Sequence, residues 1–280
     1  MMKKLVILTN ILFFSVQLYA LIDFEIIIPT YNNQEWCIQN IESVVNQTYP
    51  HWHATIIVDC ASDITAALIK NYITDNDLDD KITLILNEKR RGALANIYFA
   101  AQKCQPHKVI CLLDGDDWFA DDQVLEYYNK IYETYDIWLT YGQFVSWPSG
   151  SKGWCVPYEI ETIEQNNFRS VRDMPSHCRT FYAWLFRKID LYDLLYENKF
   201  FTMTWDQAIM FPLIEMAGER HLHVSRVTYV YNESNPLNDH KIDEELQKFL
   251  AEYIRKKERY SRLKYSYKPN KDKIKIKRRP

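Results

Sequence analysis

Residues 112–117 read Leu-Leu-Asp-Gly-Asp-Asp and place three carboxylates and a glycine at the end of an apolar run. That run, 109–113, is short, β-branched and aliphatic, and Pro106 precedes it, which predicts a buried strand of a parallel sheet. Such sheets bind ligands just beyond the carboxyl ends of their strands. Three like charges in four residues are unfavourable unless a cation approaches, and a hard divalent cation with oxygen ligands fits them. The sequence therefore predicts a metal that carries a diphosphate at this strand end.

Strand and helix patterns alternate along the chain. Apolar runs predict strands at 24–29, 53–58, 82–86, 109–113, 137–144 and 223–231. Apolar residues at helical spacing predict helices at 36–47, 64–73, 93–102, 124–135, 181–196 and 205–217. This alternation predicts an α/β fold with a Rossmann-like, mixed, mostly parallel sheet flanked by helices. The chain has no G-x-G-x-x-G motif and only six glycines, which argues against a glycine-cradled dinucleotide.

The 280 residues, 47% of them hydrophobic, are enough for one large α/β domain, which we assign to residues 23–250. Residues 1–22 begin with two Met and two Lys and continue into an apolar stretch, the layout of a signal peptide or an uncleaved signal anchor. This segment predicts a membrane-associated or secretory location, with the cytosolic face of a membrane left open.

Residues 251–280 form a predicted basic C-terminal tail. From Arg255 onward there are thirteen Lys or Arg against two acidic residues, a charge of +11, so the total of −3 leaves −14 on the preceding residues. Such a block is typical of a solvated, poorly ordered segment. The alternative is attraction to anionic lipid head groups or another polyanion.

Four polar loops follow the first predicted strands, at 30–32, 59–63, 88–92 and 114–117. Because the carboxyl ends of parallel strands share one edge of the sheet, we expect Asp59, Asp114 and Asp116 to converge around one ligand. The sequence therefore predicts a nucleotide site at this edge.

At these loops the chain resembles the inverting nucleotide-sugar glycosyltransferases of family 2, which have the GT-A fold. The matching segments are Ile27-Ile28-Pro29-Thr30-Tyr31-Asn32 for the strand into P-T-Y-N, Val58-Asp59-Cys60-Ala61-Ser62 for V-D-D-G-S, Arg91-Gly92 with Asn96, and Leu113-Asp114-Gly115-Asp116-Asp117 for D-x-D-D. The resemblance is strong over 24–141 and looser as far as Gly218. The chain departs from the pattern at Cys60 and Ala61, where the family usually has Asp and Gly, which bears on the contacts to the base.

The resemblance implies roles for the matching residues. The turn of Pro29, Thr30 and Tyr31 would line the nucleoside pocket, and Asp59 would contact the base, most often a uracil. Arg91, Asp114 and Gly115 would also contact the donor, and Arg90 is an alternative to Arg91 at the phosphates. The implied ligands of Mn²⁺ or Mg²⁺ are Asp114, Asp116 and His240. A late His is a metal ligand in some relatives, whereas a lone His is also common as a polar surface group.

The segment Thr204-Trp205-Asp206-Gln207 resembles the family's short acidic motif and implies that Asp206 is the general base. An acceptor hydroxyl must lose its proton as it attacks, and a carboxylate opposite the leaving diphosphate can take it. Asp206 could also cap the helix that follows, and Glu215 is the reserve candidate for the base. Residues 177–180 are placed before a helix, on the acceptor side.

These residues together predict a metal-dependent, inverting glycosyltransferase of the hexosyltransferase type. It would move a sugar from a nucleotide donor, a UDP-sugar, to a hydroxyl of a glycan, lipid-linked or protein acceptor, and no nucleic acid is expected. Two alternatives stay open: a catalytically silent sugar-binding or scaffold protein with the same fold, and a sugar-phosphate nucleotidyltransferase. The nucleotidyltransferase usually needs a glycine-rich phosphate loop, and residues 29–33 contain no glycine.

Overall fold

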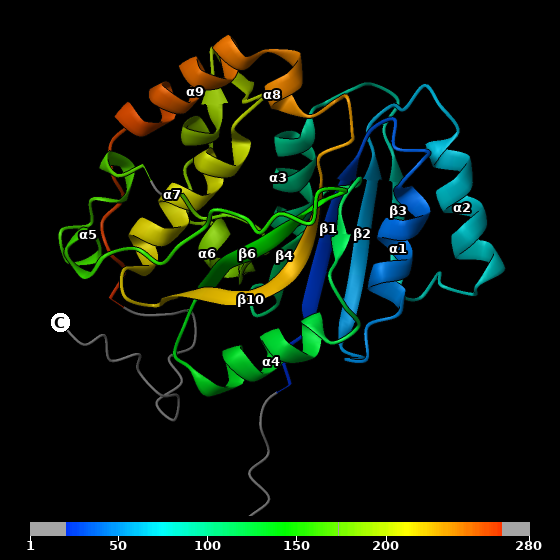
Figure 1. Cartoon of the computed structure of the whole chain (residues 1–280), viewed down its shortest axis with the longest axis horizontal. Coiled ribbons are helices and arrows are strands. Elements are labelled where there is room, and N and C mark those ends of the chain that lie inside the picture. Colours follow the sequence, from blue (N-terminus) through cyan, green and yellow to red (C-terminus); the bar gives the residue numbers. More distant parts are fainter. Residues whose placement is uncertain (1–20, 173, 265–280) are drawn as a thin grey trace, which may run out of the picture.

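A computed structural model describes residues 21–172 and 174–264 and shows a twisted sheet with helices packed on both faces (Figure 1). The main sheet of this part of the chain has the order β3-β2-β1-β4-β7-β6-β10-β5. Its strands are β1 (Phe24–Thr30), β2 (Trp52–Val58), β3 (Ile82–Leu86), β4 (Val109–Leu112), β5 (Trp118–Phe119), β6 (Leu139–Trp147), β7 (Arg179–Tyr182) and β10 (His221–Asn232).

The sheet is mixed and mostly parallel, as predicted. Strand β1 pairs in parallel with β2 and β4, β2 pairs in parallel with β3, and β10 pairs in parallel with β6. Strand β7 runs antiparallel to both β4 and β6, and β5 runs antiparallel to β10. The four parallel strands of the amino-terminal half therefore present their carboxyl ends at one edge.

Side chains of β1 alternate between two hydrophobic cores, one on each face of the sheet. Ile27 packs into the core beneath α3 (Ala93–Lys103), α6 (Ala183–Phe186) and α7 (Trp205–Ala217). Ile26 and Ile28 pack into the core beneath α1 (Cys37–Val45), α2 (Thr65–Asp75) and α4 (Val124–Thr134). Because both faces are covered, β1 reads as a continuous apolar run rather than an alternating one.

One predicted helix, 181–196, is wrong. This stretch contains the last two residues of β7, the short helix α6, a 3₁₀ helix at Leu191–Leu194 and β8 (Leu195–Tyr196), which pairs with β9 (Lys199–Phe200). Thr180 and Phe181 are fully buried and pair with both β4 and β6, so pairing across the sheet overrides the local helical spacing. Residues 177–180 therefore lead into a strand rather than a helix. The other short elements are α5 (Ile160–Glu164) and a 3₁₀ helix at Phe168–Ser170.

The predicted end segments are only partly described. Residues 1–20 of the predicted leader lie outside the described residues, and Ile22 is buried, its backbone N–H donating to Asn129 Oδ1. Within 21–172 and 174–264, no helix has the length and apolar character needed to span a bilayer. The predicted tail begins inside α9 (Glu244–Lys256), where Leu250 and Ile254 are buried. Residues 265–280 again lie outside the described part, so only the first half of the tail can be placed.

A buried ion pair ties the end of the described chain to α7. The guanidinium of Arg169 donates from Nε to Glu215 Oε1 at 2.6 Å and from Nη2 to Oε2 at 2.9 Å. Arg169 Nη1 also donates to the carbonyl of Ile254, and the N–H of Tyr260 donates to Glu215 Oε2. Glu215 is fully buried with both oxygens occupied, so its reserve assignment as a general base is wrong.

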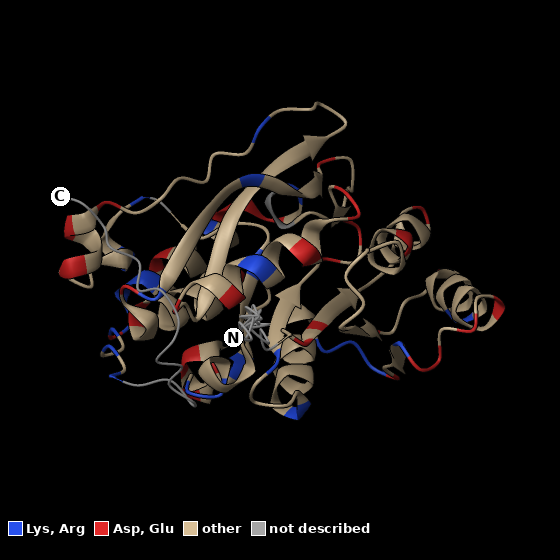
Figure 2. Ribbon diagram, turned by 90° about the horizontal axis from the view of Figure 1, so that it is seen from below, with Lys and Arg blue, Asp and Glu red and all other residues tan. Residues whose placement is uncertain are grey.

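Charged residues lie mostly on helices and loops, and the strands carry few of them (Figure 2). Glu25 is a charged residue that does lie in a strand, β1, and it is only 7% exposed. Its carboxylate contacts His53 Nδ1 at 2.8 Å and accepts from Lys108 Nζ at 2.9 Å and from the hydroxyl of Thr55. Burial alone would raise the pKa of Glu25, but these hydrogen bonds outweigh it and hold the pKa below its ordinary value.

The Glu25→Gln variant is expected to lose about 1–3 kcal/mol of unfolding free energy at neutral pH, because charge-assisted hydrogen bonds are lost in a buried place. A depressed carboxyl pKa stabilises the fold above the unfolded pKa, and this stabilisation disappears as pH falls through the folded value. The difference between variant and wild type should therefore shrink below about pH 4.5. Urea unfolding of both proteins at a series of pH values measures this difference in unfolding free energy. Glu126→Gln, which removes an exposed pair with Lys130, is the control and should change stability by under about 0.5 kcal/mol.

Candidate functional site

The loops after β1, β2 and β4 are hydrogen-bonded to one another at the carboxyl edge of the sheet. The N–H of Asp59 donates to the carbonyl of Thr30 at 2.9 Å, and the N–H of Gly115 donates to the carbonyl of Pro29 at 3.1 Å. Both Pro29 and Thr30 are buried under this junction. The loops that carry the acidic residues therefore start from one rigid centre.

Gly115 lets the acidic loop lie directly on the end of β1. A Cβ at this position would be 2.4 Å from Thr30 Cβ and 2.9 Å from the carbonyl oxygen of Pro29. Neither atom sits at the end of a flexible side chain, so any larger residue would push the loop away. The glycine of the motif is explained by this close approach.

Asp59 organises the loop that follows β3. Its carboxylate accepts hydrogen bonds from the backbone N–H groups of Arg91 and Gly92 at 2.8–3.1 Å and from Asn87 Nδ2 at 2.8 Å. Burial alone would raise the pKa of Asp59, but these donors and Asn96 hold it below its ordinary value. Asp59 is thus a fixed negative charge at the start of α3.

The two arginines of this loop point to different neighbours. The Arg90 guanidinium lies 3.8 Å from the ring centre of Tyr31, a cation–π contact between the loops after β3 and β1. Arg91 is exposed, and its guanidinium lies 5.9 Å from the ring of Phe99. Arg90 rather than Arg91 therefore packs against the predicted nucleoside pocket.

Asp117 is the most deeply buried carboxylate of the acidic loop, at 1% exposure. The hydroxyl of Tyr229 donates to its Oδ2 at 2.7 Å, and the N–H of Asn232 donates to its Oδ1 at 2.7 Å. Burial and then the charges of Asp116 and Asp114 raise the pKa of Asp117 well above its ordinary value. The electrostatics of this loop therefore favour the arrival of a cation.

Asp114 and Asp116 precede this buried carboxylate in the loop. Asp116 Oδ2 accepts from Asn235 Nδ2 at 2.6 Å. Burial raises the pKa of Asp116, and the bond from Asn235 opposes the rise. Asp114 is half-buried, its N–H donates to the Tyr229 hydroxyl at 3.1 Å, and its carbonyl accepts from Asn40 Nδ2 at 2.9 Å. Tyr229 thus holds both ends of the acidic motif.

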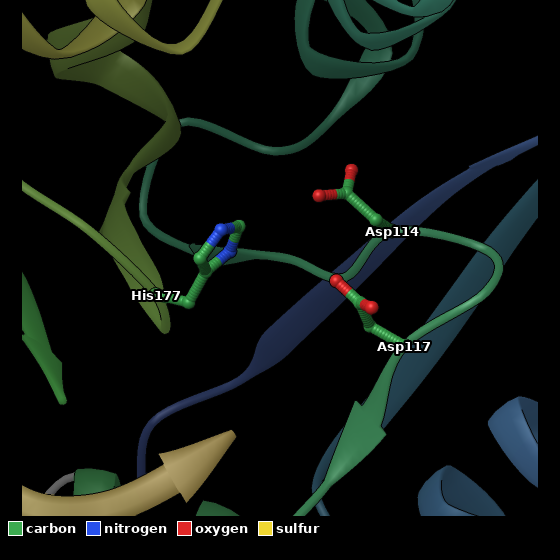
Figure 3. Close-up of side chains that lie close together, drawn as sticks. All are labelled: Asp114, Asp117 and His177. Carbon is green, nitrogen blue, oxygen red and sulfur yellow. The ribbon is translucent and has the colours of Figure 1, made fainter. Parts of the chain in front are cut away.

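The structure brings His177 to the acidic loop from a separate segment (Figure 3). One ligand atom each from Asp114, Asp117 and His177 lie within 4.8 Å of one another. Burial, and then the charge of Arg179, hold the pKa of His177 well below its usual range, so the imidazole is neutral, the form that can bind a metal. This trio differs from the predicted Asp114, Asp116 and His240. His240 lies in α8 (Asp239–Ile242), and its side chain is outside the described residues.

Asp206 lies in the first turn of α7. Its Oδ2 accepts from Arg179 Nη2 at 2.8 Å, and its Oδ1 accepts from the N–H of Gln207 at 2.9 Å. The side chain is 19% exposed. The preceding Thr204 has a φ of +52°, an uncommon conformation for a β-branched residue and one that tends to occur at functional sites. The N-cap of α7 is Thr204 and Asp206 lies inside the first turn, so Asp206 is not the capping residue, and its carboxylate can be reached from solvent.

The family model described as Glycosyl transferase family 2 matches residues 25–195 of the chain. The chain belongs to this family. The matched range of this glycosyltransferase includes Asp59, the acidic loop, His177 and Arg179, whereas Asp206 lies beyond it.

Curated relatives are similar over part of their length. The chain is 28% identical over 99 residues to the putative teichuronic acid biosynthesis glycosyltransferase TuaG of Bacillus subtilis. The matched segment covers 35% of this chain and 38% of TuaG. It is 34% identical over 97 residues to the UDP-Glc:alpha-D-GlcNAc-diphosphoundecaprenol beta-1,3-glucosyltransferase WfgD of Escherichia coli. The matched segment covers 34% of this chain and 36% of WfgD. The glycosyltransferase thus matches less than half of the length of these relatives.

Solved structures of transferases share the fold. TarS 1-349 of S. aureus superimposes with a TM-score of 0.58 at 16% sequence identity, covering 75% of this chain and 60% of that one. The mannosyltransferase PcManGT of Pyrobaculum calidifontis, in complex with GDP-Man and Mn²⁺, gives a TM-score of 0.56 at 16% identity, covering 85% and 65%. These likenesses confirm the predicted GT-A fold of the glycosyltransferase.

Proposed function

We propose that this glycosyltransferase moves a hexosyl group from a UDP-sugar to an acceptor hydroxyl in a metal-dependent, inverting reaction. The observation that carries the proposal is the acidic loop at the carboxyl edge of the sheet, in which one ligand atom each from Asp114, Asp117 and His177 lie within 4.8 Å of one another and Asp116 adds a third carboxylate. A sugar diphosphate is negatively charged and would be repelled by three carboxylates unless a cation bound between them. The family membership supports the same reaction class.

The residues of the acidic loop fit a divalent cation. The three carboxylates offer the hard oxygen ligands that Mn²⁺ and Mg²⁺ bind. Burial, and then the charges of Asp116 and Asp114, raise the pKa of Asp117, so a cation near this loop would be favourable. Asp114 and Asp116 are the proposed ligands, and His177 or His240 could supply a nitrogen. A bound ion would offset the charge that develops on the leaving diphosphate. The complex of PcManGT with GDP-Man and Mn²⁺ supports this assignment.

The loops after β1, β2 and β3 are proposed to hold the nucleoside. Tyr31 is half-buried beside Arg90 and offers a ring for stacking, with Pro29 and Thr30 below it. Asp59 would accept a hydrogen bond from the base, and Arg91 with Gly115 would face the donor phosphates. UDP is the proposed nucleotide because TarS is known in complex with UDP-GlcNAc and the name of WfgD specifies UDP-Glc.

Asp206 is proposed as the general base. The proton of the acceptor hydroxyl passes to the Asp206 carboxylate as the acceptor oxygen bonds to the anomeric carbon. The bond between that carbon and the diphosphate oxygen breaks in the same step, and the electron pair leaves with the diphosphate. Attack from the face opposite the leaving group inverts the anomeric carbon.

The acceptor is proposed to be a glycan, lipid-linked or protein hydroxyl. The name of WfgD specifies a sugar on diphosphoundecaprenol, a lipid-linked acceptor. The basic residues from Arg255 onward and the predicted leader would favour a location at an anionic membrane surface.

Donor turnover tests the proposal. The purified chain is incubated with each of a panel of nucleotide sugars, with Mn²⁺ or with EDTA, and release of free nucleotide is measured. Release from a UDP-sugar that EDTA abolishes and Mn²⁺ restores is expected. Folded protein that releases no nucleotide from any donor would favour the silent sugar-binding alternative. Formation of a UDP-sugar and diphosphate from UTP and a sugar phosphate would favour the nucleotidyltransferase instead.

A further inference from the structure

Arg179 is a buried cation in contact with Asp206. Its side chain is 4% exposed, and it stands at the start of β7, where it pairs across the sheet with Leu112, two residues before Asp114. Its Nη2 donates to Asp206 Oδ2, while the N–H of Gln207 occupies Asp206 Oδ1. Both oxygens of the carboxylate therefore have a fixed donor, and the direction of their remaining lone pairs is set.

The other side of Arg179 faces the acidic loop. Arg179 Nη1 lies 3.2 Å from His177 Nδ1, and the His177 ring stacks on Tyr229 with ring centres 4.4 Å apart. The hydroxyl of Tyr229 donates to Asp117 at 2.7 Å. An unbroken series of contacts thus joins the acidic loop, through His177 and Arg179, to Asp206.

A comparison within the molecule separates this pair from a purely structural one. Arg169 and Glu215 form a two-point pair in which both partners are buried and backbone groups complete the bonding. Arg179 instead uses one nitrogen on Asp206, which stays 19% exposed, and Arg179 Nε has no hydrogen-bond partner among the described residues. Burying a cation is costly, and a single-point pair to a partly exposed carboxylate recovers less of that cost than a two-point pair.

We propose that Arg179 is a positioning residue that fixes the direction of the Asp206 carboxylate toward the acceptor hydroxyl and holds it at a set place relative to the acidic loop. The inference rests on the proposed function, because it assigns Asp206 the role of base. The rigid, planar guanidinium suits this task better than a flexible ammonium group. Small errors in the placement of a reacting group can reduce turnover by about 10²-fold.

The test compares Arg179→Gln, Arg179→Lys and Arg179→Ala with wild type, each checked for folding by its thermal melt. At saturating Mn²⁺, we expect Arg179→Gln to lower kcat for donor turnover by about 10- to 100-fold, with KM for the donor and UDP affinity unchanged. Arg179→Lys should retain part of kcat, and millimolar guanidinium chloride should raise kcat of Arg179→Ala but not that of wild type. Arg220→Gln, which removes a partly buried pair with Asp136, is the matched control and should leave kcat unchanged.

A double variant separates positioning from an independent role. Because Arg179 acts through Asp206, adding Arg179→Gln to Asp206→Asn should lower kcat no further. A multiplicative loss in the double variant, an equal loss of UDP affinity, or a folded Arg179→Ala that guanidinium does not rescue would each overturn the inference. If Arg179→Gln does not fold, Arg179→Lys decides, and an unchanged kcat overturns it. Wild type that binds no nucleotide would instead show that the proposed function has failed, and the inference with it.

Discussion

Replacing Asp206 with asparagine is expected to lower the rate of sugar transfer by about 10² to 10⁴-fold, because a positioned base contributes that much to proton transfer. Asparagine keeps the size of the side chain and an oxygen for Arg179, so the fold should persist. The affinity for UDP should not change, because Asp206 lies on a different element from the nucleotide loops. Steady-state turnover with the best donor, together with UDP calorimetry, measures both quantities.

Asp136→Asn is a suitable comparison for Asp206→Asn. Asp136 also accepts from a partly buried arginine, Arg220 Nε at 3.2 Å, and its side chain is 18% exposed, close to the 19% of Asp206. It lies outside the proposed site, so its replacement should leave turnover within about twofold of wild type. An Asp206→Asn enzyme with normal turnover would show that another group takes the proton.

Replacing Arg169 with methionine is expected to lower the free energy of unfolding by about 3–5 kcal/mol, because it leaves the Glu215 carboxylate buried without its cation. Glu215 is fully buried, and its partner also bonds the carbonyl of Ile254, so α7 and the C-terminal segment would both loosen. Urea unfolding followed by circular dichroism measures the loss.

The double variant Arg169→Met with Glu215→Met provides the check. Exchanging both charges for apolar groups of similar length removes the uncompensated carboxylate, so most of the lost stability should return. A single Arg169→Met variant that loses under about 1 kcal/mol would mean that water or another group reaches Glu215.

The amino-terminal half of the fold could be predicted because its signals are local. The strands around Ile27 and Ile110 are apolar on both faces, and the helices between them repeat apolar residues every three or four positions. The loops after β1, β2 and β4 share an edge in any parallel sheet. The order of strands along the chain therefore predicts that Asp59 and the acidic loop lie at the same edge.

Contacts between distant residues explain what could not be predicted. Tyr229 reaches Asp114 and Asp117 from more than 100 positions away, and no periodicity or spacing marks it as part of the site. The stretch around Phe181 has apolar residues at helical spacing, yet pairing with β4 and β6 makes it a strand and brings His177 to the acidic loop. Glu215 follows Asp206 on the same helix, but the partner that occupies its carboxylate, Arg169, is 46 positions away, so the sequence does not reveal the ion pair.

Calorimetric titration of the full chain with UDP, with and without Mn²⁺, beside an Asp116→Asn variant, tests the central claim that the acidic loop is a metal-dependent donor site. We expect UDP to bind wild type only when Mn²⁺ is present. The variant, which keeps the size of the side chain beside Asn235, should bind at least about tenfold more weakly. Equal UDP affinity with and without Mn²⁺, or an unchanged affinity in the variant, would mean that the acidic loop is not a metal-dependent donor site.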